Sequence, residues 1–107
     1  MRTIKNLTEF PYGSYRVYVY LKDEQTGKKF LEQAEAEGYT FCDGEKPTNR
    51  EFSFVMAVNE DMTINYVGAN GYIAFSSNAP FVGSKRLMRV DYAKYAAGEN
   101  DYEYKKT

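Results

Sequence analysis

The sequence predicts an α+β fold, in which one main helix packs on a curved, mostly antiparallel sheet and a short helix lies near the C-terminus. Two observations predict this fold. A strand-like alternation near the N-terminus is followed at once by a helical repeat, and a run of short apolar segments separated by turn residues follows the helix. Because the chain has 107 residues, of which 43% are hydrophobic, we expect one domain over residues 1–107.

The first strand is expected over residues 14–21, where side chains alternate with a period of two. Val17 and Val19 lie on an apolar face, and Tyr18 and Tyr20 lie on the other. Because the second face is aromatic rather than charged, we expect part of it to be covered as well.

The main helix is expected over residues 24–37. Asp23 is a suitable N-cap, and Gly38 is a natural C-terminal stop. Gly27 lies on the buried face, where the missing side chain lets the helix approach the sheet closely. The residues that the helical period places on this face are Gly27, Phe30, Leu31 and Ala34.

A short strand at 39–41 and a β-hairpin are expected after the helix. Residues 48–51 (TNRE) match a capping box, which predicts one helical turn. The hairpin consists of strands at 52–58 and 63–67, joined by a four-residue loop at 59–62.

The second half of the chain is expected to add strands. Residues 68–71 (GANG) predict a tight connection that leads into a strand at 72–76. A loop at 77–85 has the least regular pattern of the chain, and residues 86–92 predict the final strand.

The short C-terminal helix is expected to begin after Asp91, which can cap it. On this helix Tyr92, Tyr95 and Ala96 share one face. Residues 99–107 are polar, which predicts a frayed tail, although two tyrosines in it are able to dock.

Eleven tyrosines, seven phenylalanines and no histidine make up the most informative compositional feature. Histidine is the side chain whose unperturbed pKa best suits proton transfer near neutrality, and it is the commonest metal ligand. The composition therefore favours binding over catalysis, and we expect neither a metal nor a cofactor. A formal net charge of −1 is not the basic excess of a general nucleic-acid binder.

Cys42 is the one cysteine, so no internal disulfide forms and a reducing compartment is favoured. Without a histidine to act as its base, we expect a buried or half-buried structural thiol rather than a nucleophile. No signal peptide or membrane-spanning stretch is recognised, so we expect a soluble cytoplasmic protein.

The acidic pairs Asp43/Glu45 and Glu60/Asp61 fall in predicted turns, where such residues usually serve turn geometry. No metal-ligand spacing joins them. The glycines of residues 68–71 are not followed by an expected helix, so a phosphate-binding loop is not predicted there.

Residues 50–57 (REFSFVMA) are similar to the RNP1 pattern of RNA-recognition motifs. Base stacking by Tyr18, Phe52 and Phe54 is the mechanism that this similarity implies. Three positions of the pattern differ, and a second long helix is missing where that fold requires one. Nucleic-acid binding therefore remains the alternative.

A basic cluster follows the irregular loop and consists of Lys85, Arg86 and Arg89. Loops held on a rigid sheet are common binding sites, so this cluster and loop 77–85 are a candidate recognition edge.

The chain as a whole resembles a group of small proteins, of unassigned activity, encoded in Firmicutes prophages and other mobile elements. The stretches that carry the resemblance are YVYLKD (18–23), FLEQAEAEGYTF (30–41), DGEKPT (43–48), TINYVG (63–68) and RVDY (89–92). The resemblance implies a protein that binds a host macromolecule, for instance to block a defence nuclease.

We therefore predict a non-enzymatic interaction protein whose partner is a host protein, with inhibition of a defence system as one such role. The alternative is a binder of single-stranded nucleic acid or nucleotides that uses an aromatic sheet face. A membrane partner is not expected, and a homo-oligomer is compatible with the sequence. The candidate partner-binding residues are Tyr18, Tyr20, Lys85, Arg86 and Arg89.

Overall fold

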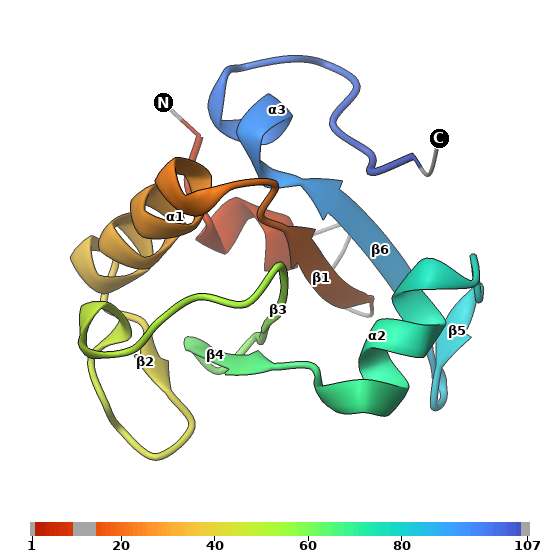
Figure 1. Ribbon diagram of the computed structural model, residues 1–107, viewed down its shortest axis with the longest axis horizontal. Helices are drawn as coiled ribbons and strands as arrows, with labels where there is room; N and C mark the ends of the chain where they lie inside the picture. Colours follow the sequence, from red (N-terminus) through yellow and green to blue (C-terminus); the bar gives the residue numbers. More distant parts are fainter. Residues whose placement is uncertain (1, 10–14, 106–107) are drawn as a thin grey trace.

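Helices cover both faces of a mixed six-stranded sheet in the computed structural model, which describes residues 2–9 and 15–105 (Figure 1). The strand order is β2-β4-β3-β1-β6-β5. In chain order the elements are η1 (Lys5–Thr8), β1 (Arg16–Tyr20), α1 (Glu24–Ala36), β2 (Thr40–Phe41), η2 (Pro47–Asn49), β3 (Val55–Val58), β4 (Thr63–Tyr66), α2 (Gly68–Ser76), β5 (Phe81–Val82), β6 (Lys85–Asp91) and α3 (Tyr92–Ala96). The predicted α+β class, with one main helix and a short C-terminal helix, is confirmed.

Strand β1 is the centre of the sheet. It pairs antiparallel with β3 and parallel with β6, and β2 also runs parallel to its neighbour β4. Val17 and Val19 are fully buried on the face that α1 covers, as the alternation predicts. Tyr18 is only 5% exposed and belongs to a second core on the opposite face. The predicted coverage of the aromatic face is therefore confirmed.

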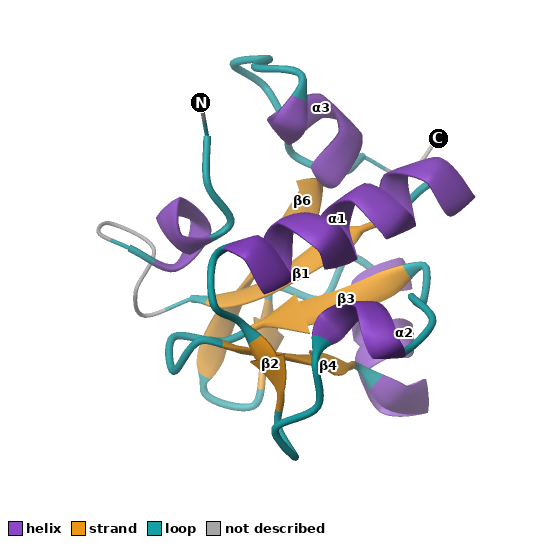
Figure 2. Cartoon of the chain, turned by 90° about the vertical axis from the view of Figure 1, so that its left-hand side faces the viewer, coloured by secondary structure: helices purple, strands orange, loops and turns teal. Residues whose placement is uncertain are grey.

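Helix α1 forms where the sequence predicts it, alongside β1 and β3 and next to α3 (Figure 2). The Asp23 carboxylate accepts a hydrogen bond of 2.8 Å from the Thr26 N–H, which lowers the pKa of Asp23. Gly38 follows the helix with a φ of +95°, a conformation that favours glycine. All four predicted stripe residues are buried: Gly27, Phe30, Leu31 and Ala34.

The prediction of a turn at 68–71 and a strand at 72–76 is wrong, because these residues form helix α2. In a helix, Gly71 and Phe75 lie one turn apart and both face the sheet, where they are buried. Gly71 allows the close approach: a Cβ at this position would lie 3.1 Å from the hydroxyl oxygen of Tyr18. Phe75 packs in the second core together with Val55 and Leu87.

Arg89 anchors the C-terminal end of α2. Its guanidinium donates hydrogen bonds to the carbonyl oxygens of Phe75 (2.9 Å), Ala74 (2.9 Å) and Ala79 (2.8 Å). The carbonyls of Ala74 and Phe75 lie at the helix end, where main-chain acceptors lack intrahelical partners and the helix dipole favours a cation, and Ala79 lies just beyond the helix. These three contacts are internal, and the assignment of Arg89 to a partner-binding cluster stays a prediction.

Residues 99–105 dock on the domain, whereas the sequence predicts a frayed tail over 99–107; residues 106 and 107 lie outside the described residues. Glu103 forms an antiparallel bridge with Val90. The ring of Tyr104 packs 4.5 Å from that of Tyr20 and 4.7 Å from that of Phe75. The tail thus completes the second core and covers an edge of β6.

Smaller differences concern element ends. The predicted hairpin forms, but β3 begins at Val55 rather than at residue 52. Residue 14 of the first predicted strand lies outside the described residues. Of the three α3 residues predicted to share one face, Tyr92 and Tyr95 are buried and Ala96 is exposed.

Arg89→Met should lower the free energy of unfolding by about 1.5–3 kcal/mol, because three charge-assisted hydrogen bonds to carbonyl oxygens at and beyond the end of α2 are lost. Urea unfolding measures the loss, and amide hydrogen exchange should quicken first in α2. Arg86→Met is the matched control: this arginine is exposed, so the change should stay within about 0.5 kcal/mol. Equal losses in the two variants would contradict the anchoring role of Arg89.

Candidate functional site

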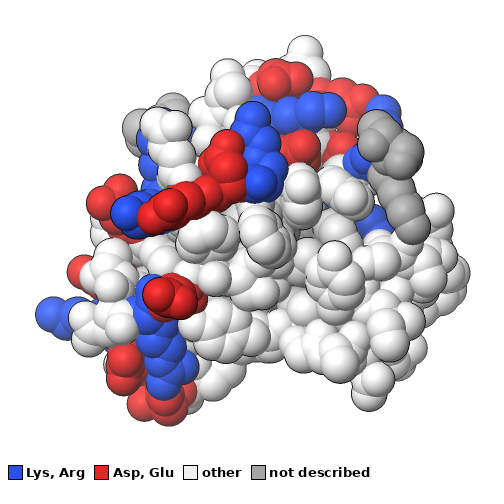
Figure 3. Space-filling model, viewed as in Figure 1, with Lys and Arg blue, Asp and Glu red and all other residues white. Residues whose placement is uncertain are grey.

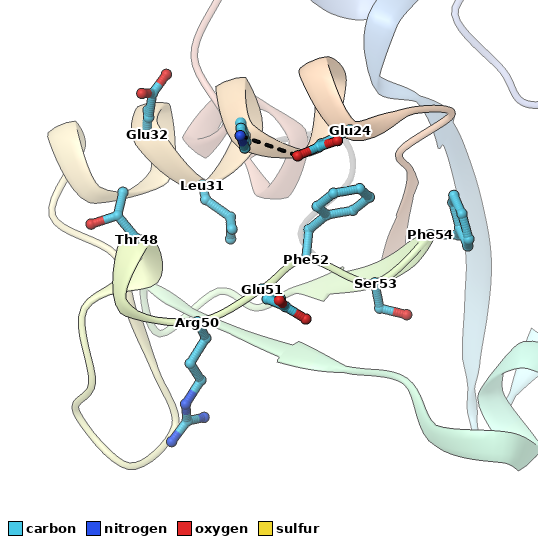
Figure 4. A pocket seen from close by; sticks show the side chains of 10 residues that line it. Glu24, Leu31, Glu32, Thr48, Arg50, Glu51, Phe52, Ser53 and Phe54 are labelled. Atoms are coloured by element: carbon cyan, nitrogen blue, oxygen red, sulfur yellow. Dashed lines mark ion pairs between the residues drawn. The ribbon is translucent and has the colours of Figure 1, made fainter.

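An open groove with a volume of 780 Å³ lies between α1 and residues 48–54 (Figure 4). Its lining residues are Glu24, Lys28, Leu31, Glu32, Thr48, Arg50, Glu51, Phe52, Ser53 and Phe54. We take this groove as the candidate site because concave surfaces of this size with apolar walls are typical of binding sites.

The floor of the groove is apolar. Leu31 points from α1 toward the Phe52 ring, and Phe54 lies at the far end beside the start of β3 (Figure 4). The rings of Phe52 and Phe54 pack edge to face, with centroids 6.0 Å apart. Phe54 is 58% exposed, so an apolar side chain of a ligand finds an aromatic surface there.

Gly27 sets the position of the floor. A Cβ at this position would lie 2.3 Å from the Cγ atom of Phe52, so the ring rests directly on the helix backbone. The predicted close approach at Gly27 is thus seen, and the contacting group is the Phe52 ring just before β3.

One end of residues 48–54 is tied to α1. The Thr48 hydroxyl and N–H both donate to the Glu35 carboxylate, at 2.7 Å and 3.2 Å, and these bonds lower the pKa of Glu35. The predicted capping box does not form, because Thr48 lies inside the turn η2 rather than before it.

The main chain in the middle of this segment is unpaired. The Leu21 N–H donates to the carbonyl of Phe54 at 2.8 Å, and the Tyr66 hydroxyl donates to the carbonyl of Glu51. Between these points, the main-chain groups of Phe52 and Ser53 have no hydrogen-bond partner among the described residues. The reason is that both neighbouring strands turn away into helices, β1 into α1 and β4 into α2.

The charged side chains of the groove are partly neutralised. Lys28 pairs with Glu24 at 3.1 Å across the surface of α1. Arg50 pairs with Asp43 and with Glu45, and it lies over the ring of Phe41. The hydrogen bond that the Arg50 guanidinium donates to the Asp43 carboxylate raises the pKa of Arg50.

Two carboxylates of the groove remain unpaired. Glu32 on α1 and Glu51 beside Phe52 have no cation within ion-pair distance among residues 2–9 and 15–105. Three carboxylates and two cations line the groove, and Arg50 is already engaged outside it. The groove therefore favours a cationic or neutral ligand over an anionic one.

The residues with chemical reactivity lie apart from one another. Within the described part of the chain, no group of three or more His, Cys, Asp or Glu is arranged to hold a metal. Cys42 is exposed, contrary to the prediction of a buried or half-buried thiol, and it contacts the Thr63 hydroxyl at 3.8 Å. Glu60 pairs with Lys85 at 3.7 Å.

The five predicted partner-binding residues do not form one surface. Tyr18 is buried, so its ring is not free to stack on bases, which contradicts that part of the prediction. Tyr20 is half-buried against Phe75 and Tyr104. Lys85 and Arg86 are exposed, and Arg86 borders a second cavity of 560 Å³ that also reaches Arg89.

One long stretch of the sequence carries no charge, and several of its apolar side chains are exposed. No charged residue occurs from Met62 to Ser84. Figure 3 shows the result: charges lie along the top and left of the view, and the area over α2 is uncharged. Among the residues that the structure describes, the large exposed apolar ones are Phe54, Tyr66, Tyr72, Ile73 and Phe81.

Comparison with known proteins found no family model, no curated protein and no solved structure that matches this chain. The resemblance to small proteins of mobile elements therefore stays a prediction. In the described part of the chain, no helix is both long enough and apolar enough to span a membrane.

Gly27→Ala should lower the free energy of unfolding by on the order of 1–3 kcal/mol, because the new methyl group displaces the Phe52 ring. In a Phe52→Ala background the same substitution should stabilise the protein by up to about 1 kcal/mol, the propensity difference between alanine and glycine in a helix. Urea unfolding of the four proteins measures both effects. A stabilising Gly27→Ala in the presence of Phe52 would show that the ring does not rest on Gly27.

Proposed function

We propose that this protein is a non-enzymatic binding module that holds an extended segment of a partner protein in the groove between α1 and residues 48–54. The observation that carries the proposal is the combination of an apolar floor with an adjacent stretch of unpaired main chain. Proteins that bind extended peptides commonly use main-chain hydrogen bonds for affinity and side-chain contacts for specificity.

The main chain of Phe52 and Ser53 supplies the polar part of the interaction. A partner segment beside it exchanges N–H and C=O hydrogen bonds that water makes in the free protein. Apolar side chains of the segment contact Leu31, Phe52 and Phe54, which removes exposed aromatic surface from water.

The charges of the groove favour a basic segment. Glu51 lies next to the unpaired main chain and forms no ion pair with the described residues. Glu32 on α1 likewise forms no ion pair with them. A lysine or arginine of the partner pairs with these carboxylates without breaking the pairs of Lys28 and Arg50. Electrostatic complementarity of this kind raises association rates and specificity.

The structure weakens the case for base stacking, the alternative that the sequence leaves open. Tyr18 and Tyr20 are covered by α2 and by the C-terminal tail, so they do not form an open aromatic platform. The unpaired carboxylates of the groove repel a phosphate backbone. The resemblance to mobile-element proteins favours a host protein as the partner, with inhibition of a defence system as one consequence of binding.

Selection from a phage-displayed library of random peptides should enrich sequences that combine apolar residues with lysine or arginine. Fluorescence anisotropy then measures the affinity of a selected peptide, and Phe54→Ser should weaken it at least about tenfold. Phe81→Ser is the matched control, because Phe81 is similarly exposed (54%) but does not line the groove.

Three results would contradict the proposal. The first is a selection that enriches no common sequence pattern. The second is an equal loss of peptide affinity in Phe54→Ser and Phe81→Ser, and the third is micromolar binding of mixed single-stranded DNA or RNA while the selected peptides do not bind.

A further inference from the structure

The two unpaired residues beside the groove direct their main-chain groups to opposite sides. The Tyr66 hydroxyl of β4 donates a hydrogen bond to the carbonyl of Glu51, so the main chain at Glu51 faces the β4 side. Residues 51–53 form neither helix nor turn, and in an extended chain successive residues direct their N–H and C=O groups to alternate sides. The groups of Phe52 therefore face α1 and the groove, whereas those of Ser53 face the β4 side.

The space beside Phe52 lies in line with β1. This strand pairs antiparallel with β3, and just beyond it the Leu21 N–H donates to the Phe54 carbonyl at 2.8 Å. In the same register Asp23 would lie opposite Phe52, but Asp23 caps α1 instead. A partner segment in the groove thus takes the position that β1 leaves free, next to main-chain groups that have no partner among the described residues.

We infer that the partner segment adds to the sheet as a short strand antiparallel to residues 51–53, and that it carries an apolar residue followed directly by a lysine or arginine. This inference rests on the proposed function, because it specifies the segment that the groove holds. Antiparallel pairing lets one partner residue exchange both hydrogen bonds with Phe52, whereas parallel pairing divides them between two residues. The antiparallel form therefore suits an open stretch in which a single residue faces the groove.

The anchor residue is the partner residue that lies opposite Phe52. Residues directly opposite each other in a β-pair direct their side chains to the same face of the sheet. The Phe52 ring rests on Gly27 of α1, and Leu31 points toward the same ring (Figure 4). The anchor side chain therefore contacts Phe52 and Leu31, and burial of apolar surface there favours an apolar anchor.

Glu51 determines which residue follows the anchor. In an antiparallel pair, the partner residue after the anchor lies opposite Glu51, in a non-hydrogen-bonded pair, where side chains come closest. Glu51 is exposed and forms no ion pair with residues 2–9 and 15–105. A lysine or arginine at this position of the partner supplies the missing cation. Glu32 lies across the groove on α1, so it does not oppose this position.

An N-methyl scan of a peptide selected for the groove tests the strand pairing. Each N-methyl group replaces one main-chain N–H of the peptide. At the anchor it removes the hydrogen bond to the Phe52 carbonyl, and the affinity measured by fluorescence anisotropy should fall at least about tenfold. At the residues on either side the N–H points away from Phe52, so the loss should stay below about threefold. Equal losses at all three positions would overturn the inference.

A charge swap tests the direction of the partner segment. Glu51→Lys should weaken a peptide that has lysine after the anchor by roughly fivefold, and a peptide with glutamate at that position should regain the affinity. Glu32→Lys is the matched control and should keep the preference for lysine there. Circular dichroism checks that both variants are folded, and should Glu51→Lys fail to fold, Glu51→Gln should still remove most of this preference. The inference is overturned if the selected basic residue precedes the anchor, or if Glu32→Lys reverses the preference and Glu51→Lys does not.

The readouts separate this inference from the proposed function. If no peptide pattern is selected, or Phe54→Ser and Phe81→Ser weaken binding equally, the proposed function fails and the inference fails with it. If Phe54→Ser weakens the selected peptides selectively but the N-methyl scan shows no alternation, the groove binds peptides and the antiparallel strand pairing alone is overturned.

Discussion

Burial of β1 on both faces is the constraint on which the other elements depend. Val17 and Val19 have no exposed surface on one side, and Tyr18 is almost completely covered on the other. A strand of this kind requires a layer on each face of the sheet, since apolar side chains left in water would cost the protein most of its stabilisation. Helix α1 provides the first layer, and α2 with the C-terminal tail provides the second.

The second layer explains the unusual character of α2. Its sequence has two glycines and a β-branched isoleucine within nine residues, and a helix this short is unstable on its own. Contacts of Gly71 and Phe75 with the sheet and the three hydrogen bonds from Arg89 decide its conformation. Gly71 and Phe75 are the buried residues of the helix, and Tyr72 and Ile73 face outward.

Elements with local signals could be predicted from the sequence, and elements decided by tertiary contacts could not. Helix α1 carries its own cap at Asp23 and its own apolar stripe, so its predicted end differs by a single residue from the observed one. The turn-like residues 68–71 lead to the prediction of a strand at 72–76, because nothing local indicates that Tyr18 needs a cover. The docking of Tyr104 could not be predicted for the same reason, since its partners Tyr20 and Phe75 are distant in sequence.

The candidate site shows the same division. The sequence singles out Phe52 and Phe54 through the similarity of residues 50–57 to an RNA-binding strand. That similarity implies that the two rings stack on bases. They line a groove instead, because β1 and β4 leave the sheet before reaching residue 52, and α1 then lies beside the unpaired chain. That arrangement follows from where two other strands end, which local patterns do not reveal.

The central claim is that tertiary contacts with β1, rather than local preference, make residues 68–76 helical. Backbone ¹³C chemical shifts test it most directly, measured in the whole protein and in a synthetic peptide of residues 66–80. We predict helical shifts for 68–76 in the protein and random-coil shifts in the peptide, because the peptide lacks both Tyr18 and Arg89. Strand-like shifts in the protein, or a stable helix in the isolated peptide, would contradict the account.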